Sequence, residues 1–286
     1  MISEKIRWKS GKHMTVQKRG EVVYLTFPSL ENKEGFLHGF STRLGGVSQG
    51  CLSSMNISRS FGEPEENVRE NLRRLADAIG FSPENIVLSH QTHTTNIKVV
   101  TEKDRGCGYD RPRDYTDVDG LITNVPGLVL TTSYADCVPL FLVDPVHRAV
   151  GLSHSGWRGT VRKIGLRTVR EMTENYGTDP GDIIAAIGPS ICQDCYEVSG
   201  DVIREFENAF PERLHELLFY KKENGKYQLN LWEAARQVFL EAGIPEENIS
   251  LPGICTCCNP DLLFSHRATG GKRGNLAAFL GIRDQE

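Results

Sequence analysis

Apolar residues recur every three or four positions in several segments, which is the period of an amphipathic helix. The clearest such segment runs from Pro64 to Ile79, where a proline stands at the start and Gly80 follows the last apolar position. A second helix is predicted to begin just after Trp157 and to end before Gly177. The same spacing predicts helices over residues 198–209 and 231–242.

Short runs rich in β-branched and aromatic residues predict strands between these helices. They cover residues 22–27, 36–43, 85–100, 119–124, 128–143, 148–154, 182–187 and 275–282. Residues 219–230 have the pattern of a hairpin that turns at Asn224-Gly225. Helices and strands alternate irregularly, without a linker or an internal repeat. We therefore predict one α+β domain over residues 1–286, with 1–20 as an N-terminal segment that could be loosely attached.

Composition narrows the class of protein. The chain carries 33 basic and 37 acidic residues, a net charge of −4, and has no basic block that would bind nucleic acid. Its longest apolar run, from Cys137 to Val143, is far shorter than the ~20 residues that span a bilayer, so no membrane association is expected. The N-terminus lacks the pattern of a secretory signal, which favours the cytoplasm. In a cytoplasmic protein, eight cysteines indicate free thiols, metal ligands or catalytic residues more readily than disulfides.

Three segments place histidine or cysteine beside a polar or glycine-containing turn. They are SHQTHT with His90 and His93, YADCVP with Cys137, and GLSHSGWRGT with His154. Catalytic zinc is typically held by three such ligands, with a fourth position open. Each residue also has an ordinary interpretation, because a lone cysteine in an apolar strand is commonly a buried hydrophobe. A lone histidine near a turn is commonly only hydrogen-bonded, so spacing alone leaves the metal site open.

Two arginines and one aspartate are further candidates. Arg158 lies between glycines where a strand gives way to a helix, a place that attracts anions, and Arg43 adjoins a second glycine turn. Phosphate or carboxylate binding is one interpretation of both, and pairing with structural carboxylates is the other. Asp136, next to Cys137, could orient a ligand or shuttle a proton, or it could cap a turn.

Taken together, the motifs resemble one known family. HGFSTRLGGVS, SHQTHT, DVDGLIT, ADCVPLFLVD, HSGWRGT, IGPSI with YEVSGDV, and the terminal LLFSHRATGG follow in the order typical of the YfiH/YlmD-type, laccase-domain family of purine nucleoside phosphorylases. The resemblance spans about residues 36–282. It implies a single layered α/β/β/α domain with mixed sheets, and zinc ligands at His93, Cys137 and His154. It also implies phosphorolysis of adenosine, inosine, guanosine and methylthioadenosine, deamination of adenosine, and anion binding at Arg43 and Arg158.

One motif departs from the family pattern. The family usually has an FSYRR-type sequence followed by TGR, where this chain has FSHRATGGKRG. No role is therefore carried over to His266, Arg267 or Arg273.

Other functions remain to be weighed against this one. A multicopper laccase is disfavoured because none of the eight histidines forms an HxH pair, although copper is compatible with a His/Cys site. Cys137 and His154 could instead form the thiolate–imidazole pair of a hydrolase, for example one that edits peptidoglycan precursors. A purine sensor without turnover is the third hypothesis.

The remaining thiols offer a second metal site. Cys192-x-x-Cys195 has good knuckle spacing, whereas Cys255-x-Cys257-Cys258 is irregular and lies about 60 residues further along. Reduced cysteines without a ligand are the favoured interpretation of these five residues.

Overall fold

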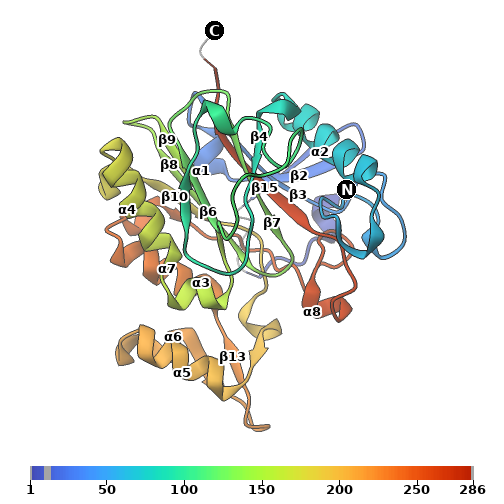
Figure 1. Cartoon of the computed structure of the whole chain (residues 1–286). Coiled ribbons are helices and arrows are strands. Elements are labelled where there is room, and N and C mark those ends of the chain that lie inside the picture. Colours follow the sequence, from blue (N-terminus) through green and yellow to red (C-terminus); the bar gives the residue numbers. More distant parts are fainter. Residues whose placement is uncertain (1, 10–13, 285–286) are drawn as a thin grey trace.

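The computed structural model describes residues 2–9 and 14–284. Over these residues two six-stranded mixed sheets face each other, and helices cover both outer faces (Figure 1). The predicted α+β class and the layering implied by the resemblance are confirmed.

The first sheet has the strand order β1-β2-β3-β15-β7-β4. Its strands are β1 (Thr15–Arg19), β2 (Val22–Thr26), β3 (Phe36–Ser41), β15 (Leu276–Ile282), β7 (Val129–Tyr134) and β4 (Ile86–Leu88). Only the edge strand β4 runs parallel to its neighbour. Helix α2 (Glu65–Ile79) covers the outer face of this sheet (Figure 1).

The second sheet has the order β14-β10-β8-β9-β6-β5. Its strands are β14 (Ile249–Ser250), β10 (Ile184–Ile187), β8 (Val138–Asp144), β9 (Ala149–Ser155), β6 (Gly120–Thr123) and β5 (Ile97–Val99). Helices α3 (Trp157–Val161), α4 (Ile164–Tyr176) and α7 (Leu231–Glu241) lie on its outer face. The two edge strands are parallel to their neighbours, and the four central strands are antiparallel.

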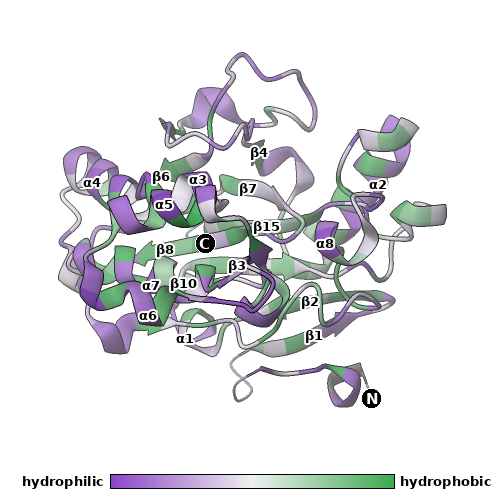
Figure 2. Cartoon of the chain, turned by 90° about the horizontal axis from the view of Figure 1, so that it is seen from below, coloured by the Kyte–Doolittle hydropathy of each residue, from purple (hydrophilic) through white to green (hydrophobic). Residues whose placement is uncertain are grey.

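Alternation along the strands divides the apolar side chains among the layers. In β15, Leu276, Ala278 and Leu280 enter the core between the two sheets, whereas Ala277 and Phe279 face α2. A third cluster lies between the second sheet and its helices. Figure 2 shows the result: strands are coloured mostly as apolar, and the outer helices carry polar faces. Three apolar interfaces thus hold four layers together.

A small unit extends from the end of the second sheet (Figure 1). It contains α5 (Gly200–Ala209), α6 (His215–Leu218) and a three-stranded sheet of β11 (Glu197–Val198), β13 (Tyr227–Leu229) and β12 (Phe219–Lys221). The hairpin predicted at Asn224-Gly225 joins β12 to β13. Two further short helices are α1 (Pro28–Glu31) and α8 (His266–Thr269). Single 3-10 turns occupy Ile2–Lys5, Gly50–Leu52, Ser60–Gly62, Pro83–Asn85, Glu102–Asp104, Pro180–Asp182, Gln193–Cys195, Glu212–Leu214 and Glu246–Asn248.

Three predicted elements prove to be interrupted. The helix expected after Trp157 divides into α3 and α4, because Lys163 adopts a left-handed φ of 58°. The segments 128–143 and 85–100 each contain two strands separated by a loop. These two loops carry Cys137 and His93.

The N-terminal segment before residue 20 is partly in contact with the domain. Strand β1 pairs with β2, and the main-chain N–H of Lys9 donates to the carbonyl of Gly253. Residues 1 and 10–13 of this segment lie outside the described residues. In the part of the chain that is described, no helix has the length and apolar character needed to cross a membrane.

Candidate active site

Four neighbouring strands of the second sheet bring the predicted ligands together. His154 lies near the end of β9, and Cys137 immediately precedes the adjacent β8. On the other side of β9, Asp119 precedes β6, and its carbonyl accepts the N–H of His154 at 2.7 Å. His93 lies in the loop before β5, the next strand along. The order β8-β9-β6-β5 therefore collects side chains that are up to 61 residues apart in sequence (154 − 93).

His93, Cys137 and His154 form a compact group of donor atoms. One ligand atom from each lies within 4.8 Å of the other two, and Sγ of Cys137 is 3.9 Å from Nε2 of His93. Donors around a tetrahedral zinc ion, at the usual Zn–S and Zn–N distances, would be separated by roughly 3.6 Å. Two imidazoles and one thiolate are also a donor set that zinc accepts. The residues present fit a zinc ion with an open fourth position.

Asp119 connects two of these residues, although sequence analysis did not select it. Its buried carboxylate accepts a hydrogen bond from Nδ1 of His154 at 2.8 Å. It also accepts the N–H groups of Thr92, His93 and Thr94 at 2.9–3.1 Å. One carboxylate thus holds the His154 ring and the loop that carries His93. With Nδ1 engaged, Nε2 of His154 is the nitrogen left to face Cys137, as in carboxylate–histidine–metal arrangements.

Two residues of the site adopt left-handed backbone conformations. The φ angle is 65° at His93 and 87° at Asp136. Such angles are uncommon for residues other than glycine and cluster at functional sites. At Asp136, the conformation turns the chain between β7 and β8 directly before Cys137.

The ionisable groups influence one another strongly. Burial alone would raise the pKa of the Cys137 thiol, but His154 and His93 lower it to about 6. Burial would lower the pKa of His154, yet the negative charges of Cys137 and Asp119 raise it to about 9. Burial likewise opposes ionisation of Asp119, and its hydrogen bonds overcome this and lower its pKa to about 2. The site therefore favours a thiolate, which is the form that binds metals.

Gly156 has no side chain at the point where His93 and Cys137 approach the main chain. It follows β9 and has an ordinary φ of −73°. A Cβ at this position would lie 2.8 Å from Cδ2 of His93 and 3.2 Å from Sγ of Cys137. The glycine of HSGWRG is thus required by the close approach of these two side chains, and not by backbone conformation.

The three other predicted site residues are placed differently. Both carboxylate oxygens of Asp136 accept hydrogen bonds, from the Thr256 hydroxyl at 2.6 Å and from the Arg267 N–H at 2.7 Å. Arg158 is exposed, and its guanidinium lies 4.3 Å from the ring of Trp157.

Arg43 is engaged mainly with the main chain. Its Nε and one terminal nitrogen donate to the carbonyl of Ser53, and the other terminal nitrogen donates to that of Pro260. Three of its five N–H groups therefore have a main-chain acceptor. The guanidinium also lies 4.6 Å from the ring of Phe264.

Arg273 is a site residue to which sequence reasoning gave no role. Burial lowers the pKa of its guanidinium, and the negative charges of Asp136 and Cys137 act in the opposite direction. Its Nε is buried and has no hydrogen-bond partner among the described residues. A buried donor without a partner calls for an acceptor, such as an anionic oxygen of a ligand.

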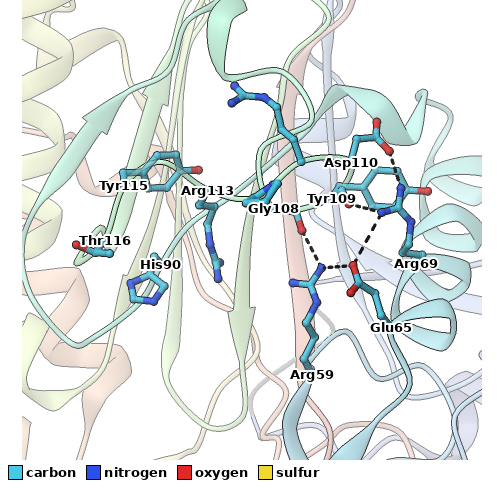
Figure 3. Close-up of a pocket in the computed structure, with 12 residues that line it drawn as sticks. Arg59, Glu65, Arg69, His90, Gly108, Tyr109, Asp110, Arg113, Tyr115 and Thr116 are labelled. Atoms are coloured by element: carbon cyan, nitrogen blue, oxygen red, sulfur yellow. Dashed lines mark hydrogen bonds and ion pairs between the residues drawn. The ribbon is translucent and has the colours of Figure 1, made fainter.

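His90, the alternative to His93, belongs to a neighbouring hollow. Its Nδ1 accepts the N–H of Asp117 at 3.1 Å, and it lies outside the group of donor atoms described above. With Arg59, Arg113 and Tyr115 it lines a cavity of about 420 Å³ (Figure 3). None of His93, Cys137 and His154 lines this cavity.

Comparison with known proteins identifies the family. A family model described as "Multi-copper polyphenol oxidoreductase laccase" matches residues 37–283, which is most of the chain. The chain belongs to this laccase-domain family. Its curated relatives include "Purine nucleoside phosphorylase YlmD" of Bacillus subtilis, 37% identical over 258 residues that cover 89% of this chain and 91% of the relative. Another is "Adenosine deaminase RL5" of an unknown prokaryotic organism, 35% identical, covering 86% of this chain and 93% of the relative.

Solved structures of the same family share the fold. YlmD from Geobacillus stearothermophilus superposes with a TM-score of 0.87 at 35% identity, over 96% of this chain and 100% of the other. The Bacillus licheniformis hypothetical protein YfiH superposes with a TM-score of 0.85 at 34% identity, over 93% and 98% of the two chains. The YfiH/YlmD resemblance seen in the motifs is thereby confirmed.

Proposed function

We propose that this protein is a zinc-dependent purine nucleoside phosphorylase with adenosine deaminase side activity. Its substrates would be phosphate with adenosine, inosine, guanosine and methylthioadenosine. The convergence of His93, Cys137 and His154, with Asp119 behind them, is the observation that carries the proposal. The names of the curated relatives, phosphorylases and one deaminase, supply the reaction class.

His93, Cys137 and His154 would hold the ion through Nε2, Sγ and Nε2. Zinc with three protein ligands acts as a Lewis acid that polarises a substrate oxygen and makes water more acidic. Asp119 fixes the tautomer of His154 and the position of the His93 loop. Copper would accept the same donors, so metal analysis is needed to identify the ion.

Phosphorolysis exchanges one bond for another at the anomeric carbon. A phosphate oxygen forms a bond to C1′ as the bond from C1′ to N9 breaks, and the purine leaves with the electron pair and takes up a proton. The protein's contribution would be to position the reactants and stabilise their charge.

Arginine residues would bind the phosphate. Arg273 has a buried Nε–H with no acceptor among the described residues, and the charge of Cys137 acts on its guanidinium. Arg158 is exposed at the start of α3. Arg43 has N–H groups beyond the three that donate to carbonyls, and phosphate binding by this residue remains a prediction. Asp136 would act as a positioning residue, because both of its carboxylate oxygens already bind Thr256 and Arg267.

The decisive assay is phosphorolysis of inosine. Purified protein should convert inosine and phosphate into hypoxanthine and ribose 1-phosphate, and Cys137→Ala should abolish this while circular dichroism shows an intact fold. Cys51→Ala, which removes an exposed thiol, is the matched control and should remain active. Full activity in Cys137→Ala would mean that the assigned site is wrong. Binding of inosine without product would favour a sensor.

A hydrolase is the second candidate, and one geometric observation favours it. Cys137, His154 and Asp119 have the order of a thiolate–imidazole–carboxylate triad, which can attack an acyl carbon. Editing of peptidoglycan precursors would be one such reaction. The triad has no need of His93, whose Nε2 also faces the thiol. Iodoacetamide should label Cys137 rapidly if it is a nucleophile, and only after chelation if it holds zinc.

We also propose a cytoplasmic location. None of the eight cysteines is in a disulfide bond, not even Cys195 and Cys258, whose sulfur atoms are 3.4 Å apart. Cysteines that stay reduced in this number, as thiols or metal ligands, are typical of a reducing compartment. Detection in the soluble fraction of a cell lysate, with no signal from the medium, would test this.

A further inference from the structure

A second group of thiols lies apart from the donor atoms of the candidate active site. Sγ atoms of Cys192, Cys195, Cys255 and Cys258 all lie within 4.8 Å of one another. Cys192 and Cys195 follow β10, and Cys255 and Cys258 precede α8. Two Cys-x-x-Cys pairs separated by about 60 residues therefore meet in space, with Cys257 outside the group.

We propose that these four cysteines form a structural zinc site. Zinc bound by four cysteines is tetrahedral, and Zn–S distances of about 2.3 Å would separate the sulfur atoms by roughly 3.8 Å. The separation of Cys195 and Cys258, 3.4 Å, is near this value and well beyond the ~2.05 Å of a disulfide bond. Four protein ligands leave no open position, in contrast to the three at the candidate active site.

The main chain around the cysteines supports ligation. The N–H of Cys192 donates to Sγ of Cys255 at 3.2 Å, which stabilises negative charge on that sulfur. The N–H groups of Cys195 and Tyr196 both donate to the carbonyl of Cys192, which forms the tight turn that brings two cysteines to one ion. Parallel bridging of Ser190 with Cys255 aligns the second pair beside the first.

A positive charge near the four cysteines also supports zinc binding. Zinc with four thiolates carries two net negative charges, and a lysine close by would offset part of this. The Lys9 ammonium interacts with Cys192 and Cys258, and it forms an ion pair with Asp194 at 2.9 Å.

The proposed ion would join two segments that border the candidate active site. Next to Cys255, Thr256 donates to the carboxylate of Asp136. Arg267, which also binds Asp136, donates to the carbonyl of Cys195. The zinc site would therefore hold the residues that fix the turn before Cys137.

The test uses Cys137→Ala, which removes a ligand of the first site and leaves the second intact. This variant should be purified under reducing conditions and should contain about one zinc per chain. Displacing the metal with a mercurial should release zinc as the four thiols react. In the same background, cobalt should give the strong visible absorption of tetrahedral thiolate coordination. Zinc far below one per chain, iron in its place, or a thiol count two lower because of a disulfide would each overturn the proposal.

Ligand identity is tested by two further variants in the Cys137→Ala background. Cys195→Ser/Cys258→Ser should lose the remaining zinc, whereas Cys257→Ser, in the same segment, should retain it. If the double variant does not fold, the zinc and thiol measurements on Cys137→Ala alone still decide. Because all readouts are metal content and thiol reactivity, failure here is distinct from failure of the proposed phosphorylase activity.

Discussion

Nδ1 of His154 lies 2.8 Å from the carboxylate of Asp119, and both side chains are buried. The same carboxylate binds three consecutive main-chain N–H groups of the loop that carries His93. One acidic residue thus sets the orientation of two histidines that come from different elements. This arrangement makes Asp119 the residue through which the geometry of the proposed metal site can be tested without altering a proposed ligand.

Replacing Asp119 by asparagine should weaken metal binding. The amide removes the negative charge that supports His154 and can no longer accept every N–H from the loop. Loss of such a partner of a metal-bound histidine typically lowers metal affinity about 10- to 100-fold. Zinc affinity measured by competition with a chromophoric chelator should show this decrease, with a parallel loss of phosphorolysis at limiting zinc.

Asp144→Asn is the matched control for this experiment. Asp144 is equally buried, binds Nδ1 of His147 at 3.0 Å and accepts two main-chain N–H groups at the other end of β8. Its loss should affect stability and leave zinc affinity unchanged. Equal zinc affinities for Asp119→Asn and the unaltered protein would refute the role assigned to Asp119.

Gly156→Ala should damage the site through steric contact alone. The new Cβ would lie 2.8 Å from His93 and 3.2 Å from Cys137, closer than side chains normally approach, so the ligands must separate. We expect reduced zinc content and activity. Gly200→Ala provides the comparison, since the nearest atom to its Cβ would be 3.8 Å away. If Gly156→Ala retains full zinc content, the ligands do not meet at this point.

The sequence predicted most of the elements because their periodicity depends on burial on one or two faces. Helix α2 and strand β15 were located to within one residue, since each has a regular pattern and a glycine or a turn at its end. The break at Lys163 was missed, because a left-handed φ at a lysine has no glycine in the sequence to indicate it.

Candidate metal ligands could be selected from residue type and position, but their partners could not. Asp119 was the first residue of a predicted strand and was given no role, and only the order of β8, β9, β6 and β5 brings it next to His154. The sequence signal that could have indicated Asp119 was the motif DVDG at the start of a buried strand. Among the other thiols, Cys257 obscured the Cys-x-x-Cys spacing of Cys255 and Cys258.

Three arginine variants should show which of these residues bind phosphate at the proposed site. Arg273→Gln removes a half-buried guanidinium whose Nε has no acceptor among the described residues, and it should raise the KM for phosphate about 10- to 100-fold, the range expected for a charged hydrogen bond. Its KM for inosine should change much less. Arg158→Gln and Arg43→Gln should show the same selectivity if they also bind phosphate. Arg167→Gln, an exposed substitution on α4, is the control. An unchanged phosphate KM in Arg273→Gln would remove this residue from the site.

Acid should destabilise the fold through His38, a residue remote from the proposed chemistry. Its side chain is buried in β3, and Nε2 accepts the N–H of Phe27 at 2.8 Å. Burial lowers its pKa to about 4, with a smaller opposing effect of Glu31, whereas the unfolded chain should have a value of about 6.5. Between these values the unfolded state binds the proton and the native state does not. Stability contributed by neutral His38 should therefore be complete above pH 6.5 and be lost as the pH falls towards 4.

His38→Gln isolates this effect, because the glutamine oxygen can still accept the Phe27 N–H and does not titrate. Urea unfolding of both proteins at several pH values would separate His38 from the carboxylates that titrate in each. Between pH 7 and pH 4.5 the unaltered protein should lose about 2 to 3 kcal/mol more stability than the variant, as follows from a pKa difference of this size. Parallel dependence of the unfolding free energy on pH in the two proteins would show that His38 is already protonated, or is accessible to water, in the native state.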